Sequence, residues 1–334
     1  MTYPSSAKQT RNLTVAAVLL ICTVAQANAH AYTAQLKAQK FDEVDKATHA
    51  ALAANPENVE ALLGRIDLLL SMHQESKLDD AVRLAEQCIQ VAPTRSECHE
   101  YLGNALGTKA LNAGLLSAMG SVGKIRNAFK KAVELDPKNI DARFSLLQFY
   151  QQAPGIVGGG KGNARALVAQ TLPINADASK LMQASEDLVE REFAKVEIAV
   201  QMPLPADPYD LQDRQRELMM SLGSTYVREK KNVDALRIFA DMQKRFPDSE
   251  LGAFGAGRAY QEQGKYTDAI AQFEKAQAIK ATAPMHFRIG QSWQALNDKP
   301  KAIAAYERAL AFKPELGKKQ REDAQEQLKV LKTS

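Results

Sequence analysis

Small and aromatic residues recur every 33 to 34 positions in the last third of the chain, which leaves few folds open to it. Gly223, Gly257 and Gly290 stand 34 and then 33 residues apart. The same spacing separates alanines later in each unit: Ala235, Ala269 and Ala302. A unit of this length holds one helical hairpin, which cannot bury its apolar face alone. The period therefore predicts an all-α stack of hairpins.

The residue types within each unit follow a fixed order. Gly223 is followed by Tyr226, Ala235, Phe239 and Pro247, and the next unit keeps the same order of small and aromatic residues. Small residues let the two helices approach closely, aromatic residues fill the groove to the next hairpin, and proline ends the second helix. This order resembles the tetratricopeptide repeat. The resemblance implies a right-handed α-solenoid of about seven to eight hairpins that binds a protein or peptide partner, without catalysis and without a cofactor.

Less regular copies of the unit precede the clear ones, and a cluster of prolines follows the weakest copy. The expected organisation is a cleaved signal peptide at 1–29, an N-terminal lobe of repeats at 30–175, a degenerate hairpin with a proline-rich linker at 176–210, a C-terminal lobe of three regular repeats at 211–316 and a capping helix at 317–334.

The first 29 residues have the pattern of a secretory signal. Lys8 and Arg11 precede an apolar run over 13–25, and Ala27 and Ala29 flank a single residue at the expected cleavage site. The run is shorter than the roughly 20 residues that span a bilayer, although an uncleaved anchor is the alternative. We therefore expect a periplasmic protein without an integral membrane span in the mature chain. Residues 102–161 also resemble exported bacterial tetratricopeptide proteins, for which the resemblance implies no particular activity.

The expected mature chain contains two cysteines, Cys88 and Cys98, ten residues apart. An oxidising compartment favours a disulfide between them, and two buried thiols are the alternative.

Three units of the N-terminal lobe are longer between their helices than the family pattern, by 5, 10 and 5 residues. The connections between the two helices of each unit line one edge of a solenoid, so we expect these insertions to meet. They are apolar enough either to pack on one another or to form a docking edge for a partner. The residues proposed for that edge are Leu111, Leu115, Leu116, Met119, Ile156 and Val157.

In the family, the first helix of each hairpin lines the concave surface. The resemblance implies that three positions of each unit face this concave surface. They lie three residues before the glycine of the unit, one residue after it and four residues after it. In the C-terminal lobe these positions, together with Arg288 beside them, predict a partner-binding groove. The alternative is that the phenylalanines turn into the core. The residues of the groove are Met220, Phe254, Arg258, Gln261, Phe287, Arg288, Gln291 and Gln294. The matching positions of the third unit are Glu100 and Asn104, and Glu100 would repel a carboxylate ligand.

The remaining patterns argue against other functions. The 43 Lys and Arg nearly balance the 39 Asp and Glu, so no strong basic field attracts nucleic acid. The five histidines lack metal-ligand spacing, and no nucleophile motif occurs. Gly155–Lys161 matches the start of a phosphate-binding loop, but Gly162 replaces the Ser or Thr that would ligate magnesium, and a helix rather than a strand precedes it. A small-ligand or nucleotide-binding protein, or an enzyme, using Gly155–Lys161 is the alternative function.

Overall fold

The computed structural model describes residues 30–72, 74–113, 120–205 and 211–333. Within these ranges the chain forms seventeen α-helices and two short 3-10 helices, and no strand. This confirms the predicted all-α solenoid. The predicted signal peptide at 1–29 lies outside the described residues.

The helices alternate as the first and second members of eight consecutive hairpins. The first four hairpins are α1 (Thr33–Lys37) with α2 (Phe41–Ala54), α3 (Val59–Ser71) with α4 (Leu78–Val91), α5 (Ser96–Ala113) with α7 (Val122–Leu135), and α8 (Ile140–Gln152) with α9 (Lys161–Thr171). The next four are α10 (Ala176–Val189) with α11 (Phe193–Val200), α12 (Leu211–Arg228) with α13 (Asn232–Arg245), α14 (Leu251–Glu262) with α15 (Tyr266–Ile279), and α16 (Ala283–Ala295) with α17 (Lys299–Ala311). The last helix, α18 (Lys318–Thr333), packs on α17 at the place predicted for a capping helix.

Asparagines fix where several of the first helices begin. The side chains of Asn58, Asn139 and Asn175 each accept a hydrogen bond from a backbone N–H three residues later, at 2.8 to 3.0 Å. This contact satisfies an N–H that has no partner within the helix. Each asparagine therefore defines the point at which the chain turns from one hairpin into the next.

Aromatic side chains of the second helices pack against glycines of the first helices. Phe239 is buried between Gly223 of its own hairpin and Gly255 of the next, and a methyl group placed on either glycine would lie 2.5 or 2.2 Å from its ring. Phe273 packs against Gly257, and Tyr306 against Gly290, each within its own hairpin. The repeating glycines are thus required because an aromatic ring of the second helix occupies the space that any side chain would need.

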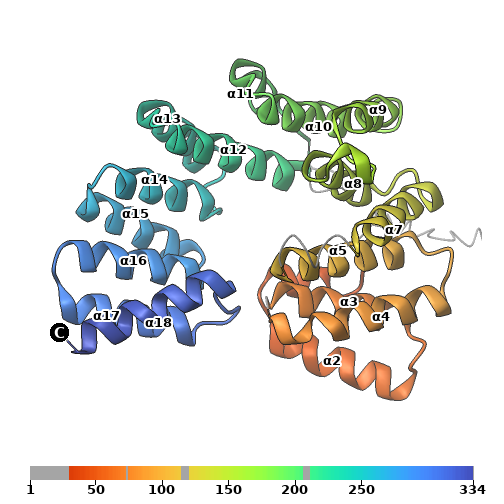
Figure 1. Cartoon of the computed structure of the whole chain (residues 1–334), viewed down its shortest axis with the longest axis horizontal. Coiled ribbons are helices and arrows are strands. Elements are labelled where there is room, and N and C mark those ends of the chain that lie inside the picture. Colours follow the sequence, from red (N-terminus) through yellow and green to blue (C-terminus); the bar gives the residue numbers. More distant parts are fainter. Residues whose placement is uncertain (1–29, 73, 114–119, 206–210, 334) are drawn as a thin grey trace, which may run out of the picture.

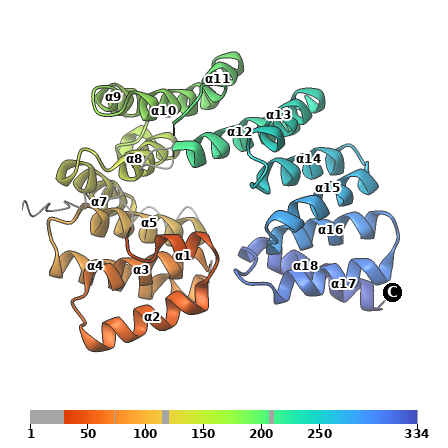
Figure 2. The same cartoon turned by 180° about the vertical axis from the view of Figure 1, so that it is seen from behind.

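The hairpins follow an open arc, with α10 and α11 at its middle and the first and last hairpins facing each other (Figures 1 and 2). We call α1 to α9 the N-terminal arm of the arc and α12 to α18 its C-terminal arm. Two ion pairs join the two arms. Lys318 Nζ of α18 lies 3.5 Å from Glu75 Oε2, in the short helix η1 (Glu75–Lys77) between α3 and α4. Lys37 Nζ of α1 lies 3.4 Å from Asp213 Oδ2 of α12.

One hydrophobic core runs through the segment expected to separate the lobes. It extends from Ile140 of α8 through Leu181 of α10 and Val196 of α11 to Phe239 of α13 and Ala256 of α14. The degenerate hairpin of α10 and α11 therefore packs on both of its neighbours. No helix within the described ranges combines the length and apolar character needed to cross a membrane.

A disulfide links the second and third hairpins. Cys88 of α4 is bonded to Cys98 of α5, and both residues are fully buried in a core that includes Leu62, Leu63 and Ile66. The bond closes a short loop around the turn between the two hairpins.

Replacing both cysteines with alanine is expected to lower the free energy of unfolding by roughly 3 kcal/mol, because the reduced unfolded chain regains the entropy of an open loop. Urea unfolding of the oxidised protein and of the double variant measures this difference. Adding reductant should destabilise the wild type by a similar amount and leave the variant unchanged. Equal destabilisation of both by reductant would contradict the prediction.

Candidate partner-binding site on the concave face

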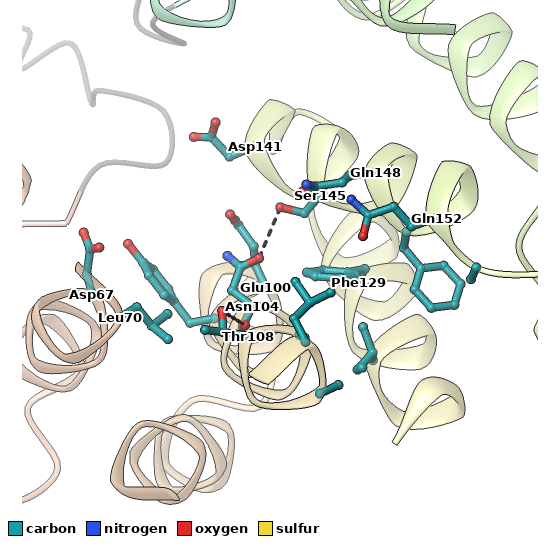
Figure 3. A pocket seen from close by; sticks show the side chains of 18 of the residues that line it. Asp67, Leu70, Glu100, Asn104, Thr108, Phe129, Asp141, Ser145, Gln148 and Gln152 are labelled. Carbon is teal, nitrogen blue, oxygen red and sulfur yellow. Dashed lines mark hydrogen bonds between the residues drawn. The ribbon is translucent and has the colours of Figure 1, made fainter. Parts of the chain in front are cut away.

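A cavity of about 810 Å³ opens on the concave face of the N-terminal arm. The first helices of the first four hairpins contribute to its wall, and the start of α12 closes one side. Figure 3 shows the labelled polar side chains of α3, α5 and α8 converging on this space. We call it the concave cavity; the residues used below are Lys37, Asp67, Leu70, Glu100, Tyr101, Asn104, Gly107, Leu111, Ile125, Phe129, Asp141, Ser145, Phe149, Pro154, Asp213, Arg214 and Glu217.

Glu100 is the most deeply buried carboxylate of the cavity wall, with 7% of its surface exposed. Its Oε2 accepts a hydrogen bond from Asn139 Nδ2 at 2.9 Å. The same amide group donates to Ser96 Oγ at 2.9 Å, and Ser96 in turn donates to the backbone oxygen of Ala132. Asn139 also caps α8. The hydrogen-bonded group of Glu100, Asn139 and Ser96 is therefore anchored at the start of that helix.

Burial and neighbouring negative charges change the acid–base properties of this wall. Burial, reinforced by the charge of Asp141, raises the pKa of Glu100 to about 8, although the hydrogen bond from Asn139 and the charge of Arg214 act in the opposite direction. Burial, with the charges of Asp67 and Glu100, raises the pKa of the Tyr101 phenol well above its ordinary value. At neutral pH the empty cavity therefore holds a protonated Glu100 beside a neutral phenol.

Arg214 of α12 brings a positive charge to the opposite side of the cavity. Its Nη2 donates to Asp141 Oδ1 at 2.6 Å and its Nη1 to Glu217 Oε2 at 3.3 Å. The guanidinium also stacks over the ring of Phe144, 5.1 Å from its centroid. Arg214 thus already contacts two carboxylates and an aromatic ring.

The rest of the wall combines apolar and neutral polar side chains. Leu70, Ile125, Phe129 and Phe149 supply the apolar surface. Near them, Ser145 Oγ donates to the Asn104 side-chain oxygen at 3.3 Å, as the dashed line in Figure 3 shows. The cavity therefore offers apolar surface for a hydrocarbon stem and polar groups for a charged or polar end.

The large apolar residues of the groove predicted in the C-terminal arm are turned toward the core. Phe287 is 3% exposed and packs on Tyr306, with 5.9 Å between ring centroids. Phe254 is partly buried against Phe273, and Met220 packs on the core that passes through α12. The phenylalanines thus follow the alternative of turning toward the core, because their rings gain more from burial between hairpins than from facing solvent.

The polar residues of that groove form a chain of hydrogen bonds along α14 and α16. Arg288 Nη1 donates to Gln261 Oε1 at 3.1 Å and to Gln291 Oε1 at 3.4 Å. Arg258 Nη1 donates to Ser224 Oγ at 3.3 Å, and Gln294 bonds to Gln327 of α18. Partial burial lowers the pKa of both arginines. These arginine and glutamine side chains are half-buried rather than fully exposed to solvent.

The proposed docking edge is described only in part. Leu111 and Ile156 are 74% and 96% exposed. Val157 accepts a hydrogen bond from Arg126 through its backbone oxygen at 3.2 Å, which ties the insertion of the fourth hairpin to α7 of the third hairpin. Leu115, Leu116 and Met119 lie outside the described residues. Leu111 and Pro154 also belong to the wall of the concave cavity, so the insertions border it.

The glycine-rich segment that resembles a phosphate-binding loop is a tight turn. The N–H groups of Gly158, Gly159 and Gly160 donate to the backbone oxygens of Gly155, Pro154 and Tyr150, respectively. Gly158 and Gly160 have positive φ, and a side chain on Gly159 would collide with the oxygen of Ala153. Lys161 is paired with Glu190 at 2.6 Å. The N–H groups of these three glycines are therefore already used, and the glycines are explained by the turn.

Residue spacing did not reveal the contact between Arg214 and Asp141 across the cavity. Glu100 and Asn104 occupy inward positions that the glycine register predicts. Arg214, however, lies 73 residues from Asp141 and reaches it because the arc brings α12 beside α8. No pattern in the sequence marks this contact. Within the described residues, no group of three or more potential metal ligands comes together.

Comparisons with known proteins agree with this architecture. The family model described as Tetratricopeptide repeat matches residues 220–284 and 254–316. Protein CTR9 homolog of Arabidopsis thaliana is 22% identical over 278 residues, covering 78% of this chain and 24% of that protein. The chain thus spans about a quarter of the length of this curated relative.

One solved structure, yeast Tom70, shares this fold at low sequence identity. Yeast Tom70 is 12% identical, with a TM-score of 0.57 over 83% of this chain and 57% of that chain. A tetratricopeptide repeat protein from Parabacteroides merdae is 17% identical, with a TM-score of 0.46 over 89% of this chain and 98% of that chain. Solenoids of this kind are interaction scaffolds with extended concave surfaces. The two overlapping matches to the Tetratricopeptide repeat model cover the C-terminal hairpins, and the remaining described hairpins continue the same stacked helical-hairpin fold.

Proposed function

We propose that this protein is a non-catalytic, exported scaffold that binds a partner protein through the concave cavity, within an assembly or maturation process of the cell envelope. The observation that carries the proposal is the cavity itself. It has about 810 Å³ of space, apolar and polar walls, and side chains from five first helices of the solenoid. An extended peptide segment needs this combination for affinity and for orientation.

Two features support export. The pattern at 1–29 is that of a secretory signal, and the Cys88–Cys98 disulfide is favoured by an oxidising compartment. A periplasmic location would place the scaffold among envelope proteins, and the near balance of charge gives no support to a nucleic-acid partner.

A variant that fills the cavity tests the proposal. Gly107 lines the cavity on α5, and a methyl group placed on it meets no atom within 4 Å. Gly107→Trp should therefore fold, since mid-helix glycine is replaced by a better helix former, while its indole occupies the cavity. We expect in-cell crosslinking and affinity purification to recover a discrete partner with the wild type and at least about tenfold less with Gly107→Trp.

Gly123→Trp is the matched control. Gly123 lies near the start of α7, is exposed, has the same open space around it and does not line the cavity. It should retain the partner, and thermal unfolding should show that both variants are folded. Equal recovery with both variants would overturn the concave cavity as the binding site. Sequencing the purified chain from its N-terminus, expected at His30, tests export in the same preparation.

A further inference from the structure

Glu100 lacks a cationic partner, whereas three of the other four carboxylates of the concave cavity pair with a lysine or an arginine. Asp141 and Glu217 are paired with Arg214, and Asp213 is paired with Lys37. Across the residues that the structure describes, no Lys, Arg or His lies within ion-pair distance of Glu100, which accepts one hydrogen bond from an amide.

Asp67, the remaining carboxylate of the wall, is also already bonded. Its Oδ2 lies 3.0 Å from His30 Nε2, and its Oδ1 accepts a hydrogen bond from Ser71. Glu100 is therefore the one described carboxylate of this cavity that has neither a basic side chain nor a histidine beside it, although nine-tenths of it is buried. Burying a carboxyl group without a counter-charge is costly unless it carries a proton or a cation arrives.

The space beside Glu100 suits a long basic side chain. Leu70, Ile125 and Phe129 supply an apolar wall that an aliphatic stem can cover. Asn104 and Ser145 lie in the same wall and offer further polar atoms to a charged head. The cavity is far larger than one ion requires, and its remaining volume accommodates the backbone of an extended segment.

We propose that the concave cavity binds a basic side chain, lysine or arginine, on an extended segment of the partner protein, and that Glu100 supplies the counter-charge for its cationic head. This inference rests on the proposed function and specifies its chemistry. Five carboxylates and two basic side chains line the cavity, so its charge is complementary to a basic segment.

Binding exchanges a proton for the cation. Burial, with Asp141 and Glu97 adding negative charge against the hydrogen bond from Asn139 and the charge of Arg214, raises the pKa of the Glu100 carboxyl group to about 8, so this group carries a proton at neutral pH. The neighbouring phenol of Tyr101 has a raised pKa and stays neutral over the same range. When the cation approaches, the proton leaves to solvent and the carboxylate forms a charge-assisted hydrogen bond. The affinity for a basic side chain should therefore increase with pH, up to the pH at which Glu100 is already ionised before binding.

Four acetylated, amidated seven-residue peptides with alanine and serine around a central lysine, arginine, norleucine or glutamate provide the probes. Norleucine matches the lysine stem without its charge. Binding to the full mature chain is measured by calorimetry. At about pH 8.5 we expect the lysine and arginine peptides to bind at least about tenfold more tightly than the norleucine peptide, the effect of one charge-assisted hydrogen bond. The glutamate peptide should bind most weakly.

The pH dependence and the Glu100→Gln variant isolate the carboxyl group. Affinity of the wild type for the lysine peptide should rise about 20-fold between about pH 6.5 and about pH 8.5, with release of a proton measured in buffers of different ionisation enthalpy. Glu100→Gln should remove the preference for basic peptides, the pH dependence and the proton release. Glu274→Gln, an exposed change on α15, is the matched control and should retain all three.

The outcomes separate this inference from the proposed function. Equal binding of the norleucine and lysine peptides, blocked by Gly107→Trp, would overturn the role of Glu100 and leave the cavity as the binding site. A preference for lysine that persists in Glu100→Gln would also overturn it. Binding of the peptides unaffected by Gly107→Trp, or binding of none of them, would count against both the inference and the cavity.

Discussion

Phe239→Ala is expected to lower the free energy of unfolding by about 4 kcal/mol, the usual cost of removing a fully buried phenylalanine ring. The ring is 1% exposed and fills the space between Gly223 of its own hairpin and Gly255 of the next. Neither glycine has a side chain that could move into the vacated volume. The variant therefore leaves a cavity at a junction between hairpins, where each unit depends on its neighbour for stability.

Urea unfolding followed by circular dichroism measures this loss. Val233→Ala on the same helix is the control, because Val233 is 84% exposed and its truncation should change stability by less than about 0.5 kcal/mol. Phe239→Leu should fall between the two, since leucine fills part of the space. If Phe239→Ala were as stable as Val233→Ala, the ring would not be the contact that holds these hairpins together.

Glu100→Gln is expected to stabilise the empty protein above neutral pH. The folded chain holds the Glu100 proton up to a pKa of about 8, whereas the unfolded chain loses it near the ordinary glutamate pKa of 4.5. Between these values the folded state binds more protons than the unfolded state, so the stability contributed by the protonated carboxyl declines as pH rises and is lost above about 8. The shift corresponds to a difference on the order of 4 kcal/mol. Glutamine keeps the oxygen that accepts from Asn139 and does not titrate.

The measurement is the difference in unfolding free energy between Glu100→Gln and the wild type, at about pH 4.5 and again at about pH 8.5. The difference should grow in favour of the variant as pH rises through this window. Glu274→Gln provides the comparison for an exposed carboxyl group and should show no such trend. A difference that is the same at both pH values would show that the pKa of Glu100 is the same in the folded and the unfolded chain.

The period of the last three units predicted helices α12 to α17, because spacing, small residues and prolines are local properties of the sequence. The glycine register also placed Glu100 on the concave side. The same register position is occupied by Phe254 and Phe287 in the C-terminal arm, and there the rings turn into the core. A register specifies the direction of a Cα–Cβ bond, whereas the polarity of the side chain decides whether it remains at the surface or enters the next hairpin.

Contacts across the arc were beyond the reach of the sequence. Lys37 meets Asp213, and Arg214 meets Asp141, because small rotations between successive hairpins add up to a curve that returns α12 to the N-terminal arm. Each rotation depends on packing details that no residue pattern states. The segment Gly155–Lys161 is a local example of the same limit. Its sequence matches a phosphate-binding loop, but only the structure shows that the N–H groups of its last three glycines are already bonded.

The contact between Lys318 and Glu75 closes the mouth of the arc with an exposed ion pair. Such a pair contributes at most about 1 kcal/mol and is weakened by physiological salt. A contact of this size is close to thermal energy and does not by itself hold the two tips together. The width of the opening between the tips therefore depends on the stiffness of the eight stacked hairpins, in which each unit is held by its neighbours.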